Sequence, residues 1–273
     1  MPNDATPLSF VYHRVRRVLE LRTLLVKMAF HDLRTQFAGS AMGAVWSFVH
    51  PLVMALVLWF VFTYGLRAAP VEDVPFHVWL FCGIFPWTFF SEALSRSCVS
   101  LQDKAYLIRQ PDFCMALIPT VSAISSALVH LVFIAILFVF ALSAGIAPSW
   151  HWLQFAYYGG SLLFLVVGLG WLVSSLHLFL RDTAQVVSVL LQLGFWLTPV
   201  FWHPNSMPRE FTRHLDFSPV AYVIAGYRDS LFGSSWFWQQ PRLAAIFWAE
   251  ALLIFFGGLA VFRRLRPHFL DML

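Results

Sequence analysis

Six long apolar segments dominate this sequence and restrict what the chain can fold into. A helix needs about 20 apolar residues to cross the hydrocarbon core of a bilayer, which is about 30 Å thick. Only 12% of the 273 residues are charged, against roughly 25% in soluble globular domains. Because so few charges cannot cover a surface in water, we expect an all-α polytopic membrane protein with one transmembrane domain over residues 1–273.

The apolar segments and the polar gaps between them predict six transmembrane helices. They cover residues 44–66, 77–95, 119–144, 154–178, 183–202 and 243–262. If each segment crosses in turn, 13 of the 18 Lys and Arg residues lie on one side of the membrane and five on the other. Since cytoplasmic loops carry the excess of basic residues, both termini are expected in the cytoplasm.

Residues 203–240, between the fifth and sixth predicted spans, contain a seventh apolar run that is too short to cross. This run, from Phe217 to Ala225, is about half the length of a span. Counting it as a crossing would also reverse the asymmetry of basic residues. Pro204 and Pro219 interrupt the region, so we expect a re-entrant hairpin on the outer side.

Residues 18–34, before the first span, carry an amphipathic pattern. Leu21, Leu25 and Met28 recur at helical spacing, opposed by polar residues such as Arg22 and Lys27. The pattern predicts an interface helix that lies along the cytoplasmic face of the membrane. An ordinary cytoplasmic helix packed on the rest of the protein is the alternative.

Lysine usage argues against ATP hydrolysis by this chain. A phosphate-binding loop needs Lys followed by Ser or Thr. The chain has two lysines, and Lys27 precedes Met28 while Lys104 precedes Ala105. If ATP drives this protein, a separate subunit must therefore bind it.

Polar groups inside the predicted spans are few, and they include Glu92, His130, His177 and Glu250. A carboxylate at membrane depth is a functional candidate because placing it there costs about 2.5–3.5 kcal/mol. For Glu250, a structural pair, a channel-lining position and a catalytic role all stay open. No HExxH or comparable metal-ligand spacing occurs, so we predict neither a metal site nor a catalytic residue.

Aromatic residues are unusually frequent, with 29 Phe, 12 Trp and 7 Tyr. Many of them will face lipid or pack between helices. Aromatic rings can also stack on the C–H faces of sugars without a fixed hydrogen-bond register, which suits a sliding polymer. The predicted channel-lining residues in the first, second and sixth spans are Trp46, Trp59, Phe60, Tyr64, Trp87, Phe89, Phe90 and Glu250.

Short sequence pieces along nearly the whole chain resemble one known family. In order, they are His31-Asp32-Leu33-Arg34, Gly39-Ser40, Gly43, Trp46, Pro51-Leu52, Phe85-Pro86-Trp87, Phe89-Phe90-Ser91-Glu92-Ala93-Leu94, Arg181-Asp182, Gln185, Leu191-Gln192, Thr198-Pro199-Val200, Ser218-Pro219, Arg228-Asp229 and Gly233. Together they resemble the permease subunits of ABC-2 type exporters of cell-surface polysaccharides. The chain departs from that family at His31, where Arg is frequent, and at Ser218, where Asn is frequent.

The resemblance implies a half-transporter in the bacterial inner membrane. Two copies would form the channel as a homodimer, and two ATP-binding cassette subunits would hold ATP and Mg²⁺ on the cytoplasmic side. It also implies a coupling region at residues 96–114 and a lateral opening for lipid-linked substrate between spans one and five. The residues expected to couple to the partner are Arg96, Asp103, Lys104, Arg109, Arg181 and Asp182. Those expected at an outer gate are Pro204, Pro219, Arg228 and Asp229.

The substrate expected from the resemblance is a lipid-linked cell-surface polysaccharide. O-antigen is favoured over capsule polysaccharide or teichoic acid, because the Phe-Pro-Trp and Phe-Phe-Ser-Glu-Ala-Leu pieces are most similar to O-antigen permeases. The alternatives are a membrane-embedded transferase acting on lipid-linked sugars, and a passive channel or secondary transporter. The basic residues are explained by membrane orientation, so no nucleic-acid partner is predicted.

Overall fold

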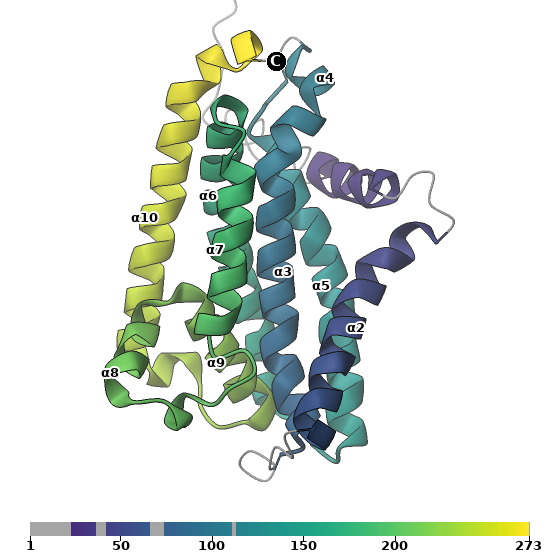
Figure 1. Cartoon of the computed structure of the whole chain (residues 1–273), viewed down its shortest axis with the longest axis vertical. Helices are drawn as coiled ribbons and strands as arrows, with labels where there is room; N and C mark the ends of the chain where they lie inside the picture. The colour runs from purple at the N-terminus through teal and green to yellow at the C-terminus, as the bar shows by residue number, and fades with distance from the viewer. Residues whose placement is uncertain (1–22, 37–41, 66–73, 111–112, 273) are drawn as a thin grey trace, which may run out of the picture.

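The computed structural model describes residues 23–36, 42–65, 74–110 and 113–272, and these parts of the chain are helical with no β-strand. Five helical stretches are long and apolar enough to cross a membrane. They are Trp46–Gly65, Phe76–Asp103, Leu117–Ser143, Trp150–Phe179 and Pro241–His268. Figure 1 shows them as a bundle of long, roughly parallel or antiparallel helices. Residues 18–22 of the predicted interface helix, Gly39 and Ser40 lie outside the described residues.

The long helices are joined by short ones. The bundle helices are α2 (Trp46–Phe60), α3 (Phe76–Asp103), α5 (Leu117–Ser143), α6 (Gln154–Phe179), α7 (Thr183–Leu197) and α10 (Pro241–Leu265). The shorter elements are η1 (Gly43–Val45), η2 (Val61–Gly65), α4 (Ala105–Ile108), η3 (Trp150–Leu153), η4 (Pro204–Ser206), α8 (Arg209–Thr212), η5 (Arg213–Phe217), α9 (Pro219–Phe232), η6 (Phe237–Gln239), η7 (Arg266–His268) and η8 (Leu270–Met272).

Helix α3 is the centre of the bundle. It packs against α2, α5, α6, α7 and α9, and most of its side chains are buried, including Phe85 against Phe133 of α5 (ring centroids 5.0 Å). The sequence predicts the second span to end at residue 95, but α3 continues to Asp103. Ser97, Cys98 and Leu101 remain buried beyond Arg96, so packing extends the helix past the apolar segment.

Helices α6 and α10 cross at two glycines. A Cβ atom on Gly168 would contact the Phe255 backbone, and one on Gly258 would contact the Gly168 carbonyl oxygen. Small residues let helix backbones approach closely in membrane proteins, where apolar burial between helices gives little driving force. The glycines therefore fix how α10 lies on α6.

Residues 203–240 cover one end of the bundle, the lower end in Figure 1. Within them, α9 is largely buried, and its Tyr227 hydroxyl lies 2.8 Å from Nε2 of His130 on α5. Ser218 caps α9 by accepting a hydrogen bond from the Ala221 amide (3.4 Å). Because Ser and Asn are equally good N-caps, Ser218 fulfils this role although it departs from the family pattern.

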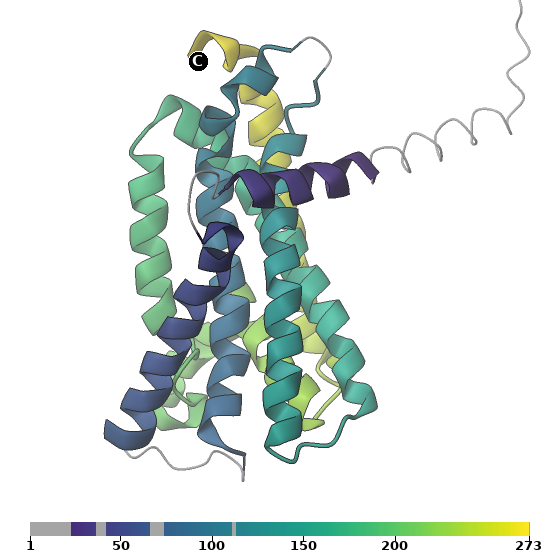
Figure 2. The same cartoon turned by 90° about the vertical axis from the view of Figure 1, so that its right-hand side faces the viewer.

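Residues 23–35 form a helix that lies across the bundle rather than along it (Figure 2). It crosses near the end that carries α4 and the C-terminus. Its Ala29 and Asp32 are buried, while Lys27 and Arg34 are exposed. The helix therefore packs one face on the bundle.

Candidate functional site

A groove of about 760 Å³ lies between α2, α3 and α7. Helix α3 forms its floor with Ile84, Trp87, Thr88, Ser91, Glu92 and Ser95. Helices α2 and α7 form its walls with Trp46, Ser47, His50, Pro51, Met54, Ser188, Leu191, Gln192, Phe195 and Trp196. The α3 and α7 positions recur every three or four residues, which places them on one face of each helix.

The groove is aromatic at one end. Trp87 packs against Phe195 of α7 (ring centroids 5.9 Å) and against Phe90 (5.7 Å). Gly194 permits this contact, because a Cβ atom there would lie 2.8 Å from the Trp87 ring. The Trp196 side chain of α7 remains 58% exposed at the groove. This end therefore offers flat apolar surfaces.

The other end of the groove carries hydrogen-bonding groups from all three helices. Ser47 and His50 come from α2, and Ser188 and Gln192 come from α7. Ser47, His50 and Ser188 belong to the helix half nearer to helix 23–35, as Ser91, Glu92 and Ser95 do on α3, whereas Gln192 lies just past the middle of α7. Both His50 and Arg96 lie near enough to Glu92 to interact electrostatically with it. The groove therefore becomes more polar toward helix 23–35, although Trp46 of α2 also lines it there.

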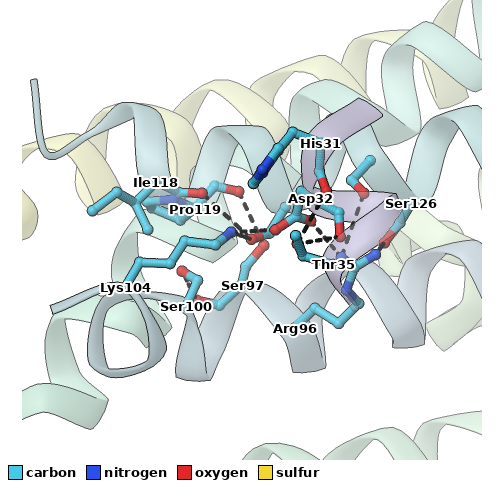
Figure 3. A network of polar contacts seen from close by, with 12 residues as sticks. His31, Asp32, Thr35, Arg96, Ser97, Ser100, Lys104, Ile118, Pro119 and Ser126 are labelled. Atoms are coloured by element: carbon cyan, nitrogen blue, oxygen red, sulfur yellow. Dashed lines mark hydrogen bonds and ion pairs between the residues drawn. The ribbon is translucent and has the colours of Figure 1, made fainter. Parts of the chain in front are cut away.

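A charged cluster next to this polar end joins helix 23–35 to the bundle (Figure 3). The Asp32 carboxylate lies 2.5 Å from Nη2 of Arg96 and 2.5 Å from Nζ of Lys104. Arg96 also donates hydrogen bonds to Ser125 and Ser126 of α5 (3.4 and 3.2 Å). The Asp32 carboxylate thus connects helix 23–35 with α3, and Arg96 in turn connects α3 with α5.

The predicted channel-lining residues occupy different surroundings. Trp46 and Trp87 line the groove. Phe89 is buried in the bundle and stacks on His130 (4.8 Å), and Phe90 is buried beside Trp87. At the far end of the first helical stretch, Trp59 contacts Tyr64. Phe60 and Tyr64 are 60% and 63% exposed on the outside of the chain.

Glu250 lies on α10, which packs on α6 and α9 and supplies no residue to the groove. Its Oε2 atom is buried without a hydrogen-bond partner. The structure thus separates Glu250 from Trp46 and Trp87, the two predicted channel residues that share a cavity.

The predicted partner-coupling residues divide into two groups. Arg96 and Lys104 pair with Asp32 inside the chain. Asp103, Arg109, Arg181 and Asp182 are exposed, and they belong to the loop-side ends of α3, α4, α6 and α7. Asp32 itself was missed as a site residue, although a signal for it exists. Asp32 follows Met28 by four positions and therefore lies on the apolar face of the helix. A carboxylate on a face that packs against protein needs a partner for its charge.

Two of the four predicted outer-gate residues, Arg228 and Asp229, fasten α9 to neighbouring segments. Arg228 donates a hydrogen bond to the Val200 carbonyl oxygen (2.9 Å), and its guanidinium lies 3.6 Å from the Trp79 ring centroid. The Asp229 carboxylate accepts hydrogen bonds from Ser234, Ser235 and Gln240, just after the helix ends. Pro204 and Pro219 are the first residues of η4 and α9, where the missing amide hydrogen costs nothing.

The described residues contain no group of three or more His, Cys, Asp or Glu that could hold a metal ion. His130 and His177, two of the histidines inside the spans, contact other side chains of the bundle. His130 contacts Tyr227, and Nε2 of His177 lies 3.1 Å from the Gln102 side chain. The polar groups considered for catalysis are therefore spread over the bundle rather than gathered at one site.

Comparison with known proteins gives this architecture a family. The profile of the family "ABC-2 type transporter" matches residues 24–232, more than half of the chain, including the groove and α9. The chain belongs to the ABC-2 type transporter family. With five helical stretches that are long and apolar enough to cross, this ABC-2 protein is a multi-pass membrane protein.

Individual relatives of this ABC-2 protein match it along most of their length. It is 27% identical to an O-antigen export system permease protein RfbA of Klebsiella pneumoniae, over 92% of this chain and 95% of the relative. It is 23% identical to the O-antigen export system permease protein RfbA of Myxococcus xanthus, over 94% of this chain and 98% of that relative. It is 22% identical to the polysialic acid transport protein KpsM of Escherichia coli, over 79% of this chain and 84% of that relative.

Proposed function

We propose that this chain is the permease subunit of an ATP-driven exporter of a lipid-linked cell-surface polysaccharide, with O-antigen as the favoured polymer. The observation that carries the proposal is the groove between α2, α3 and α7, in a chain that belongs to the ABC-2 family. Relatives named as exporters of O-antigen and of polysialic acid support a polysaccharide as the substrate class. The bacterial inner membrane is the corresponding location.

The groove would be the lateral opening through which the substrate leaves the inner leaflet. Its walls are the predicted first and fifth spans, α2 and α7, and both helices expose apolar side chains such as Val53, Leu190 and Leu193. A lipid chain can lie against such surfaces while the glycan enters between the helices. The surroundings of the groove therefore suit a substrate that is part lipid and part sugar.

Helix α7, the predicted fifth span, would bring the number of crossings from five to six, although its 15 residues span only about 22 Å. The chain beyond it would complete the crossing without a helix. Backbone of that kind is tolerated at membrane depth only where protein buries it and pairs its polar groups. Thr198, Pro199 and Val200 are buried, and Arg228 donates a hydrogen bond to the Val200 carbonyl oxygen. These contacts support six spans, with residues 203–240 as the re-entrant outer gate.

Partner subunits would supply the energy. The exposed residues Asp103, Arg109, Arg181 and Asp182 all belong to the end of the bundle that the basic residues assign to the cytoplasm. Two ATP-binding cassette subunits docked there would bind ATP and Mg²⁺, and two copies of this chain would form the channel. Helix 23–35, held by Asp32 on the same end, would lie at the membrane interface.

Deletion and reconstitution test this function. A strain without this chain should lose its surface glycan and accumulate the lipid-linked precursor. The purified chain should copurify with an ATP-binding subunit, and the complex should hydrolyse ATP faster in the presence of the lipid-linked glycan. Transferase activity of the chain alone would support the enzyme alternative. Glycan flux without ATP would support a passive channel or secondary transporter.

Two tryptophan variants locate the transport path. Trp87→Ala, which opens the aromatic end of the groove, should lower export while leaving complex assembly intact. Trp59→Ala should do the same if the path also passes the end of the first helical stretch. Normal surface glycan in either variant would remove that tryptophan from the path.

A further inference from the structure

We propose that the polar end of the groove binds the sugar residues of the substrate, through uncharged hydrogen bonds and one carboxylate, and that it does not bind the phosphate that links sugar to lipid. This inference rests on the proposed export function. It concerns Thr88, Ser91, Glu92 and Ser95 on α3, which form one polar stripe on the floor of the groove.

The α3 stripe offers hydrogen-bond acceptors to the groove. The Thr88 hydroxyl donates its hydrogen to the Ile84 carbonyl (2.8 Å), and the Ser91 hydroxyl donates to the Thr88 carbonyl (3.1 Å). Because each hydroxyl hydrogen is already used in these bonds, each hydroxyl oxygen can offer only its lone pairs to a ligand in the groove, and so acts as an acceptor. The Glu92 carboxylate, which also has Gln36 as a hydrogen-bond partner, accepts only when it is ionised. The floor therefore suits a ligand that brings its own O–H donors.

The facing walls supply the complementary groups. The Gln192 amide on α7 both donates and accepts, as does the imidazole of His50 on α2 when neutral. Sugar hydroxyls donate and accept in the same way, so a saccharide can satisfy the floor and both walls at once. An apolar ligand would leave these groups without partners, which is costly away from water.

The charge of the groove argues against a phosphate. Arg and Lys are the usual side-chain partners of phosphate groups. Among the described residues that line this groove there is no Arg or Lys, and there is one carboxylate, Glu92. Arg96 follows Ser95 of the groove lining directly and pairs with Asp32. Arg96 also interacts electrostatically with Glu92, so the two carboxylates of Asp32 and Glu92 match the charges of Arg96 and Lys104. A phosphate in the groove would therefore add negative charge without an unmatched Arg or Lys beside it.

Binding of two lipids to the complex tests the proposal. The complex of this chain with its ATP-binding subunit, in nanodiscs, would be titrated with a radiolabelled lipid pyrophosphate that carries an oligosaccharide of the exported glycan, and with the same lipid without sugar. Thr88→Val with Ser91→Ala should raise the Kd for the sugar-bearing lipid about tenfold, because two acceptors are lost. The Kd for the bare lipid should stay within about twofold.

Three further variants separate the explanations. Ser143→Ala is the matched control, because Ser143 donates to the Phe140 carbonyl (2.8 Å) as Ser91 does to Thr88, but outside the groove. Ser91→Thr keeps the acceptor and should keep wild-type affinity. Glu92→Gln should raise the Kd of the sugar-bearing lipid about threefold or more, because a charge-assisted hydrogen bond becomes a neutral one, whereas a phosphate site would bind both lipids more tightly once the carboxylate is neutral.

The outcomes distinguish this inference from the function on which it rests. An equal rise of both Kd values in the Thr88 and Ser91 double variant, or no rise in either, would overturn the sugar site while wild-type export continued. Tighter binding of both lipids by Glu92→Gln would assign the groove to the phosphate. Failure of the wild-type complex to bind the sugar-bearing lipid, with surface glycan intact in the deletion strain, would overturn the proposed function and the sugar site together.

Discussion

The carboxylate of Asp32 lies 2.5 Å from the ammonium group of Lys104, at the junction of helix 23–35 with the end of α3. Arg96, two helical turns earlier on α3, contacts the other oxygen of the same carboxylate. The three side chains are between 9% and 20% exposed, so water screens them poorly. Movement of α3 is thereby linked to helix 23–35 through one acidic residue.

Replacing Asp32 should destabilise the chain more than replacing either cation. Asp32→Asn leaves Arg96 and Lys104 close together without their counter-charge, and removing one partner of a buried pair costs about 3 kcal/mol. Lys104→Met should cost less, because Asp32 keeps Arg96. Thermal unfolding in detergent measures both changes. Arg34→Gln, on the exposed face of the same helix, is the control. Equal unfolding temperatures for Asp32→Asn and Arg34→Gln would contradict this role.

Arg228→Lys should loosen the segment between α7 and α9 although it keeps the positive charge. Only the planar guanidinium can stack on Trp79 while it donates to the Val200 carbonyl. We expect a loss of about 2 kcal/mol and faster proteolysis within residues 203–217. Arg242→Lys is the matched control, because Arg242 is 78% exposed and lies 3.8 Å from Asp216. Similar cleavage rates for the two variants would sink the prediction.

Neighbouring glycines on α10 should respond in opposite ways to alanine. Gly258→Ala places a methyl group against the Gly168 carbonyl and should destabilise the α6–α10 contact by about 2 kcal/mol. Gly257→Ala meets no atom within 4 Å and should be neutral or stabilising by about 0.5–1 kcal/mol, because alanine favours the helix. Unfolding in detergent compares the two. A loss of the same size in both variants would show that helix packing does not depend on Gly258.

Hydropathy predicts where the long helices of this chain lie better than where they end. The sequence ends the second span at residue 95, before Arg96, because a charge stops an apolar segment. The structure continues α3 to Asp103, since Arg96 and Lys104 find a carboxylate 64 and 72 residues earlier in the chain. A hydropathy window cannot detect this compensation, because it depends on residues that are distant in sequence.

The candidate site could be predicted in its parts but not in its arrangement. Periodicity identifies one face of α3 that carries Trp87, Ser91 and Glu92. The approach of α7 to that face depends on Gly194, whose missing side chain admits the Trp87 ring. Successive residues of a helix point in directions about 100° apart. Whether Phe89 lies in the groove or in the core therefore depends on how α3 is rotated about its own axis. Composition alone does not determine that rotation.

Cysteine labelling tests the orientation of the chain in the membrane. Cys114 is exposed, whereas Cys82 and Cys98 are buried. If the end with α4 is cytoplasmic, a membrane-impermeant maleimide should label inverted vesicles and leave spheroplasts unlabelled. Cys114→Ser should abolish the labelling in vesicles, because the two buried thiols do not react. Labelling of wild-type spheroplasts would place Cys114 outside and reverse the predicted topology. Slower labelling of Cys114 in the complex with an ATP-binding subunit would support docking at this end of the bundle.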